Sequence, residues 1–177
     1  MAQLLNNHLI LDFSHVYCDE NIPRNDKIHW IDCSDIYECD LYCSQSAEEE
    51  IHRRIDPYGI GGIHFLDSGN YHYVTKIMTD RISEPFSLIL FDHHTDMQPP
   101  LIDGMNSCGD WARSVLLTNP NLQQLVLIGP KKADIQAVFT DKQLKAREKK
   151  MLKEKLIAFP AEELRAGEGH EKAEKIR

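Results

Sequence analysis

The run Ser87–Phe91 (SLILF) constrains the fold of this 177-residue chain more than any other segment. It is apolar after its first residue and is bounded by Pro85 and Asp92. Continuous apolar runs of this kind are typical of strands that are covered on both faces, as in parallel sheets. We therefore predict a buried strand here, with Asp92 and the residues after it at the carboxyl end of that strand.

Other strand-like runs alternate along the chain with segments of helical periodicity. The predicted strands are His8–Phe13, Trp30–Cys33, Ile63–Leu66, Ser87–Phe91 and Leu125–Ile128, and the predicted helices are Ser46–Ile55, Tyr71–Ile82 and Ser107–Leu117. Strands that alternate with helices of about ten residues indicate βαβ units and a mostly parallel sheet with helices on both sides. The sequence thus predicts an α/β fold in which ligands bind at the carboxyl ends of the strands.

The C-terminal part of the chain has a different composition. Asp141–Lys155 is rich in Lys and Glu and favours a solvated helix, Leu156–Phe159 is a short apolar piece, and Ala161–Arg177 is charged. We expect a single domain over residues 1–177, with residues 141–177 as a charged helical tail segment.

The formal net charge of −8 bears on the partners of the protein. Phosphate binding needs a clustered excess of Lys and Arg, so we expect a small-molecule partner rather than nucleic acid. Apolar runs such as Phe86–Phe91 are too short to span a membrane, and Met1–Asn7 lacks the regions of a signal peptide. We expect a cytoplasmic protein without a membrane partner.

Five cysteines are present, an odd number that does not suggest a disulfide framework in a chain without a signal peptide. Cys33, Cys39 and Cys43 are close enough in sequence for a zinc cluster, but their C-x5-C-x3-C spacing lacks the usual CxxC pair. Reduced thiols are the favoured interpretation.

The segment Asp92-His93-His94-Thr95-Asp96 carries two carboxylates and two imidazoles in five residues. If the chain stays extended after the strand, alternate residues point the same way, so that Asp92, His94 and Asp96 share one face. Two neighbouring carboxylates repel each other unless a cation or a proton lies between them. Oxygen and nitrogen ligands without sulfur suit Mn²⁺, Zn²⁺ or Fe²⁺. The alternative is a polar loop whose aspartates cap the next element.

His72 is the best further ligand, because it follows the turn Asp67–Asn70 at the start of a predicted helix. Its alternative role is that of a helix-start histidine packed against the sheet. His64 lies within a predicted strand and is expected to face the core. The remaining histidines lack ligand spacing and are expected to be structural or on the surface: His8, His15, His29, His52 and His170.

A histidine after a Gly turn, followed by a strand that ends in D-x-H-x-D, resembles the arginase–agmatinase (ureohydrolase) superfamily. The stretches HLILDFSHVY, WIDCSDIYECDLYC, GIHFLDSGNYHYVTKI, EPFSLILFDHHTDMQ and SCGDWARSVL are similar to a bacterial branch of arginase-family proteins, over about residues 8–130. The resemblance implies a three-layer α/β/α fold and two Mn²⁺ ions, with Zn²⁺ or Fe²⁺ as alternatives. It implies that His72, Asp92 and Asp96 bind one metal, that Asp92 and His94 bind the other, and that a bridging solvent becomes the attacking hydroxide.

The sequence departs from that family in three places. Family members carry a later D-x-D, which none of Asp103, Asp110, Asp134 and Asp141 forms. We therefore expect the N-terminal part of a longer protein, with a fold incomplete at its C-terminus and weak Mn²⁺ binding by these residues alone. The turn before His72 is Gly-Asn-Tyr rather than Gly-Gly-Asp. Cys108 precedes Gly109 where arginases have a His-Gly pair.

Cys108 is consequently a candidate catalytic nucleophile or acid, although a small buried residue at a helix start is the favoured interpretation. The leading functional hypothesis is a metal-dependent hydrolase of a non-peptide C–N bond in a guanidino or related substrate. The alternatives are a catalytically inactive metal- or ligand-binding protein and a structural or interaction domain. A homo-oligomer is compatible with each of these functions.

Overall fold

The computed structural model describes residues 7–22, 25–166 and 170–176, and these form two compact units. The first unit takes its described residues from Met1–Arg81 and Pro100–Cys108, and the second from Ile82–Pro99 and Gly109–Arg177. Each unit has its own parallel sheet, which is described separately below.

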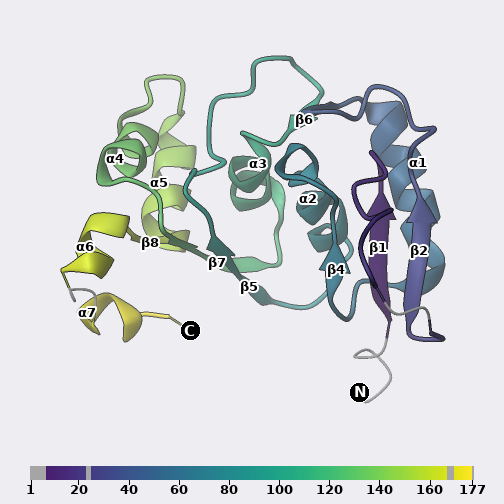
Figure 1. The fold of residues 1–177 in the computed structure, drawn as a ribbon. Coiled ribbons are helices and arrows are strands. Elements are labelled where there is room, and N and C mark those ends of the chain that lie inside the picture. Colours follow the sequence, from purple (N-terminus) through teal and green to yellow (C-terminus); the bar gives the residue numbers. More distant parts are fainter. Residues whose placement is uncertain (1–6, 23–24, 167–169, 177) are drawn as a thin grey trace. The chain divides into compact units, whose positions relative to one another are not determined.

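The first unit is built on a parallel sheet of strand order β2-β1-β4, with β1 in the middle (Figure 1). The register pairs Asp12 at the end of β1 with Asp32 at the end of β2. Among the described residues, the first unit also contains a short antiparallel pair of strands, β3 with β6. The elements are β1 (His8–Asp12), β2 (Ile28–Asp32), β3 (Tyr42–Cys43), α1 (Gln45–Ile55), η1 (Asp56–Tyr58), β4 (His64–Phe65), η2 (Gly69–Tyr71), α2 (Val74–Thr79) and β6 (Asn106–Ser107).

Helix α1 shows how the sequence specifies its own start. Ser44 is the N-cap, and its side chain accepts a hydrogen bond from the Ala47 backbone N–H at 3.3 Å. Ala47, Ile51 and Ile55 recur at intervals of four and are buried, which makes one apolar face of the helix. The predicted helix is confirmed, with its serine cap at Ser44.

The second unit contains a parallel sheet of order β5-β7-β8, with β7 in the middle (Figure 1). Helices α3 and α5 contact each other and β7. The elements are β5 (Phe86–Phe91), α3 (Trp111–Thr118), β7 (Leu122–Ile128), α4 (Lys132–Thr140), α5 (Ala146–Lys155), β8 (Leu156–Phe159), α6 (Ala161–Arg165) and α7 (His170–Ala173).

The strand β5 differs from its prediction. It forms where expected, but burial alternates along it, and Ile89 and Phe91 are 52% and 76% exposed. β5 is an edge strand of its sheet, and the face that carries Ser87, Ile89 and Phe91 is exposed. The more deeply buried strand is β7, where Leu125, Val126 and Leu127 are consecutive and inaccessible to solvent.

Two segments differ in type from their predictions. The predicted helix Ser107–Leu117 begins only at Trp111, because Asn106–Ser107 pairs with β3 as a strand. The charged tail is not helical throughout, since Leu156–Phe159 is the third strand of the second sheet.

The α/β class with parallel sheets and helices is confirmed. The three-layer arrangement of the arginase type stays a prediction. Among the described residues, no helix is long and apolar enough to cross a membrane.

The central position of β7 predicts where the second unit is most sensitive to mutation. Leu127→Ala removes a fully buried side chain and should lower the free energy of unfolding by about 2–5 kcal/mol. Gln123→Ala, at an exposed position of the same strand, should change it by less than about 0.5 kcal/mol. Urea unfolding followed by circular dichroism measures both, and equal losses in the two variants would contradict the burial of β7.

Candidate metal sites

The first candidate site begins where β5 ends. The Asp92 backbone N–H donates to the Ile128 carbonyl at 3.0 Å, which places Asp92 beside the carboxyl end of β7. The chain then bends at His93 and His94 instead of remaining extended. The bend is closed by the His94 backbone N–H, which donates to Asp92 Oδ1 at 2.9 Å. The prediction that the chain stays extended through the motif is therefore wrong, because an aspartate side chain turns the backbone.

Asp96 is held by the start of helix α3. Its carbonyl accepts hydrogen bonds from the backbone N–H groups of Ala112 and Arg113 at 3.0 and 3.2 Å. Its Oδ2 accepts the indole N–H of Trp111 at 2.7 Å, and the residue is 5% exposed. Asp96 has a φ of 48°, in the left-handed region that Asp tolerates better than most residues. These contacts fix the direction of a buried carboxylate.

Asp92 and Asp96 thereby come together, as the sequence predicted. Each offers a carboxylate oxygen within 4.8 Å of the other. The Asp92 side chain is 11% exposed. Two anionic groups this close and this poorly solvated favour a cation between them, and paired oxygen ligands suit Mn²⁺. The donor set therefore fits a hard divalent metal.

His94 lies beside this pair but faces solvent. Its Nδ1 is 3.5 Å from Asp92 Oδ1, and its side chain is 83% exposed. It borders a groove of about 430 Å³ in the second unit, to which Thr95, Met97, Asp134 and Asp141 also contribute. The sequence placed His94 on the metal-binding face, whereas the bend turns its ring toward this groove.

His72 and Cys108 belong to the first unit, so their pairing with the motif stays a prediction. His72 is half-buried and follows η2, and its backbone N–H donates to the Gly69 carbonyl at 3.3 Å. Cys108 is half-buried directly after β6, and its backbone N–H donates to the Leu41 carbonyl at 2.9 Å. It does not lie at a helix start, because α3 begins three residues later.

Gly129 packs directly on the backbone of the motif. Its φ is +111°, and a Cβ atom at this position would lie 2.7 Å from the Asp92 carbonyl oxygen. The sequence predicted Gly129-Pro130 only as a strand end. The close approach shows a second role, which is to admit Asp92 at the end of β7.

The three clustered cysteines are buried free thiols. Burial raises the pKa of Cys33 and of Cys43 to about 12, and it also raises the pKa of Cys39. At neutral pH, such pKa values keep the metal-free thiols of Cys33 and Cys43 protonated. The interpretation of Cys33, Cys39 and Cys43 as reduced thiols without zinc stays a prediction.

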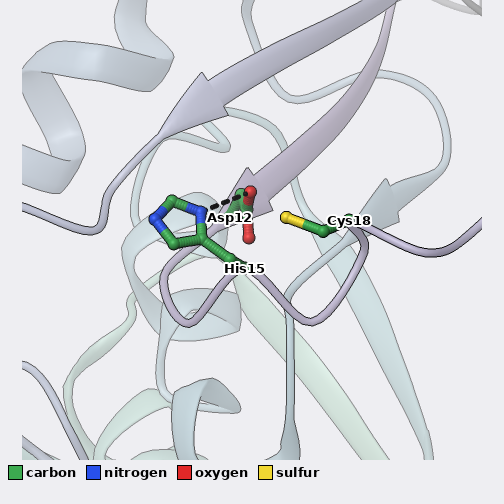
Figure 2. Close-up of side chains that lie close together, drawn as sticks. All are labelled: Asp12, His15 and Cys18. Carbon is green, nitrogen blue, oxygen red and sulfur yellow. Dashed lines mark hydrogen bonds and ion pairs between the residues drawn. The ribbon is translucent and has the colours of Figure 1, made fainter.

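A second candidate site was missed by the sequence analysis. Asp12, His15 and Cys18 each present a potential metal-ligand atom, and the three atoms lie within 4.8 Å of one another. Figure 2 shows the Asp12 carboxylate between the His15 ring and the Cys18 sulfur. The expectation that His15 is structural or on the surface overlooked its spacing, which is D-x2-H-x2-C directly after a strand.

The burial of the thiols predicts their reactivity. A thiol of pKa about 12 is ionised in about one molecule in ten thousand at pH 8, so Cys33 and Cys43 should resist iodoacetamide. Cys18 is exposed and should be alkylated in the native protein. Peptide mass spectrometry before and after unfolding in urea measures the labelling. Equal native labelling of all three cysteines would contradict the burial.

Gly129 offers a test of how the first candidate site is built. Gly129→Ala should displace Asp92, lower the free energy of unfolding by about 1–3 kcal/mol and weaken metal binding at the motif. Gly104→Ala is a matched control, because Gly104 also has a positive φ but a Cβ there meets open space. Its loss should be about 1 kcal/mol or less, with metal binding retained. Urea unfolding and Mn²⁺ titration check both variants, and identical behaviour would contradict the role of the close contact.

Comparison with known proteins adds one weak similarity. No family model and no solved structure matches the chain. The chain is similar to an uncharacterized protein of Thermotoga maritima, with 31% identity over 79 residues. The matched segment covers 44% of this chain and 31% of that protein, so the chain spans about a third of the length of this relative.

Proposed function

We propose that this chain carries part of a metal centre on Asp92 and Asp96 and contributes to a metal-dependent hydrolase that cleaves a non-peptide C–N bond. The observation that carries the proposal is the approach of the two carboxylates within 4.8 Å at the carboxyl end of β5. In parallel α/β sheets, this end of the strands is where ligands bind. His72 as a further ligand stays a prediction of the sequence.

In the second unit, two residues would bind the ion and a third would orient one of these ligands. Asp92 and Asp96 supply the oxygen ligands, and Trp111 orients Asp96 through its indole N–H. Such partners behind a ligand typically contribute 10–100-fold to metal affinity. The exposed ring of His94 can turn toward Asp92 without leaving a packed position, which suits a ligand for a second ion. A bound Mn²⁺ lowers the pKa of its water and so supplies a nucleophile at neutral pH.

The groove beside His94 supports a cationic substrate of the guanidino type. Asp134 is exposed in the first turn of α4, and Asp141 lies along the same groove. Arg113 neutralises part of this charge, because its guanidinium donates to Asp141 at 2.6 Å and holds the pKa of that carboxyl below its usual value. Asp134 is therefore the carboxylate better placed to attract a planar cation.

The alternative function is a catalytically inactive metal- or ligand-binding protein. The outward direction of the His94 ring favours it, because a two-metal centre needs a nitrogen ligand that the described conformation directs to solvent. Cys108 stands where arginases have the histidine of a His-Gly pair, which also favours the inactive protein. Release of urea or ammonia from a panel of guanidino compounds, with Mn²⁺ present, separates the two functions.

Manganese affinity tests the proposed centre directly. Asp92→Asn and Asp96→Asn each remove a negative charge from the carboxylate pair and should weaken Mn²⁺ binding at least about tenfold. Trp111→Phe should weaken it by a comparable factor, because Asp96 loses its indole donor. The control is Asp103→Asn, at an exposed position outside the motif, which should bind Mn²⁺ like the wild type.

Electron paramagnetic resonance of free Mn²⁺ during a titration gives the affinities. Equal affinity in the wild type, Asp92→Asn and Asp96→Asn would sink the metal centre. Unchanged binding together with a folded circular dichroism spectrum would leave the motif as a polar loop that caps α3.

A further inference from the structure

We propose that the loop after β1 forms a separate metal site of the zinc type, with Asp12, His15 and Cys18 as its three protein ligands. The site lies wholly within the first unit, and it does not depend on the carboxylate pair of the second unit. It offers oxygen, nitrogen and sulfur, one of each, and leaves a fourth position for water or a ligand.

The spacing of the three ligand atoms suits one small ion. Zinc binds nitrogen, oxygen and sulfur at about 2.0–2.3 Å in a tetrahedron, so its ligand atoms lie roughly 3.4 Å apart. His15 Nδ1 and Asp12 Oδ2 are 3.2 Å apart, and the three candidate ligand atoms all lie within 4.8 Å of one another. In Figure 2 the Cys18 sulfur approaches the Asp12 carboxylate from the side opposite the His15 ring. Cys18 is exposed, so its side chain has room to move toward the other two ligand atoms.

Asp12 supplies an independent reason to expect a cation. The residue is 8% exposed, and its Oδ1 is buried without a hydrogen-bond partner among the described residues. A buried carboxylate oxygen in this condition costs free energy that a bound cation would recover. The lone pairs of Oδ1 are therefore available to a cation.

The loop that presents His15 and Cys18 is held in place by protein contacts. The Asp67 carboxylate accepts three hydrogen bonds, from the backbone N–H groups of Phe13 and Ser14 and from the Ser14 hydroxyl, at 2.8–2.9 Å. The Tyr17 hydroxyl accepts the Asp67 backbone N–H at 2.6 Å. His15 sits at a φ of 61°, which is uncommon for a residue with a side chain. Strained positions of this kind are maintained where the surrounding structure fixes them, and they cluster at functional sites.

The place of the loop in the sheet agrees with ligand binding. β1 lies between β2 and β4, and the chain passes from β1 to β2 before it returns to β4 on the other side. Adjacent strands whose connections leave in opposite directions open a crevice at their carboxyl ends, and this is where α/β proteins bind ligands. Asp12 ends β1 at that point, and Asp67 follows β4 there.

The ligand set selects the kind of metal. A thiolate and an imidazole suit borderline ions such as Zn²⁺, whereas Mg²⁺ and Mn²⁺ favour carboxylates and water. The same three side chains could instead form a catalytic cysteine–histidine pair, but the Cys18 sulfur would then have to face a nitrogen of His15 that takes its proton. Figure 2 shows Nδ1 of His15 engaged with Asp12 and the other ring nitrogen pointing away from Cys18. The geometry thus favours coordination over a cysteine–histidine pair.

Zinc affinity of the whole chain tests the site. Competition with a chromophoric chelator should show one Zn²⁺ ion whose affinity falls by more than about 100-fold in Cys18→Ser and in His15→Ala, since loss of a ligand exceeds the effect of losing a supporting contact. Both side chains are exposed, so both variants should fold. His52→Ala, at an exposed position on α1, is the matched histidine control and should bind like the wild type.

Cobalt gives a readout that depends on sulfur. Co²⁺ bound to the wild type should show thiolate-to-metal charge-transfer absorption, which Cys18→Ser should lose while the control keeps it. Zn²⁺ should also slow alkylation of Cys18. Absence of the charge-transfer absorption in the wild type, or wild-type zinc affinity in both ligand variants, would overturn the proposal. Neither result depends on Mn²⁺ binding at Asp92 and Asp96, so the two sites succeed or fail independently.

Discussion

Both units depend on a central parallel strand whose two neighbours hold it in register. In the first unit β1 pairs with β2 and β4, and in the second β7 pairs with β5 and β8. Parallel pairing brings the carboxyl ends of neighbouring strands to one edge, where the apolar runs stop and the backbone groups need new partners. Acidic residues occupy those ends, Asp12 and Asp32 in one sheet and Asp92 in the other. Both candidate metal sites thus lie at the carboxyl ends of the strands, where the buried apolar runs stop.

At each site, the acids do more than offer ligand atoms, because they also shape the backbone around them. The Asp92 carboxylate accepts the His94 backbone N–H and so closes the bend. The Asp67 carboxylate accepts hydrogen bonds from Ser14 and so fixes the loop that carries His15. Asp96 accepts two backbone N–H groups at the start of α3 through its own carbonyl. Each of these contacts removes freedom from a side chain before any ion arrives, which lowers the entropy cost of binding. Three of the residues involved, His15, Asp67 and Asp96, hold a positive φ.

The sequence predicted the elements that rest on apolar periodicity and missed those that rest on side-chain hydrogen bonds. The strands β1 and β5 and the helix α1 formed where the runs of Leu and Ile and the serine cap indicated. The exposure of β5 could not be predicted, because an edge strand and a central strand can share one apolar sequence.

The same distinction explains the outcome at the sites. The pairing of Asp92 with Asp96 was predicted correctly, but for the wrong local reason, since a bend rather than an extended chain brings them together. The cluster at His15 was missed because its geometry needs a left-handed residue and a clamp from Asp67, which is 53 residues distant from Ser14. Spacing alone does not reveal contacts of that range.

The different ligand sets of the two sites also have a consequence for metal selection. Zinc outcompetes manganese at most sites of mixed ligands, so a carboxylate pair keeps manganese only where zinc is scarce or bound elsewhere. A thiolate-bearing site in the first unit is therefore expected to bind Zn²⁺ more tightly than the carboxylate pair of the second unit does.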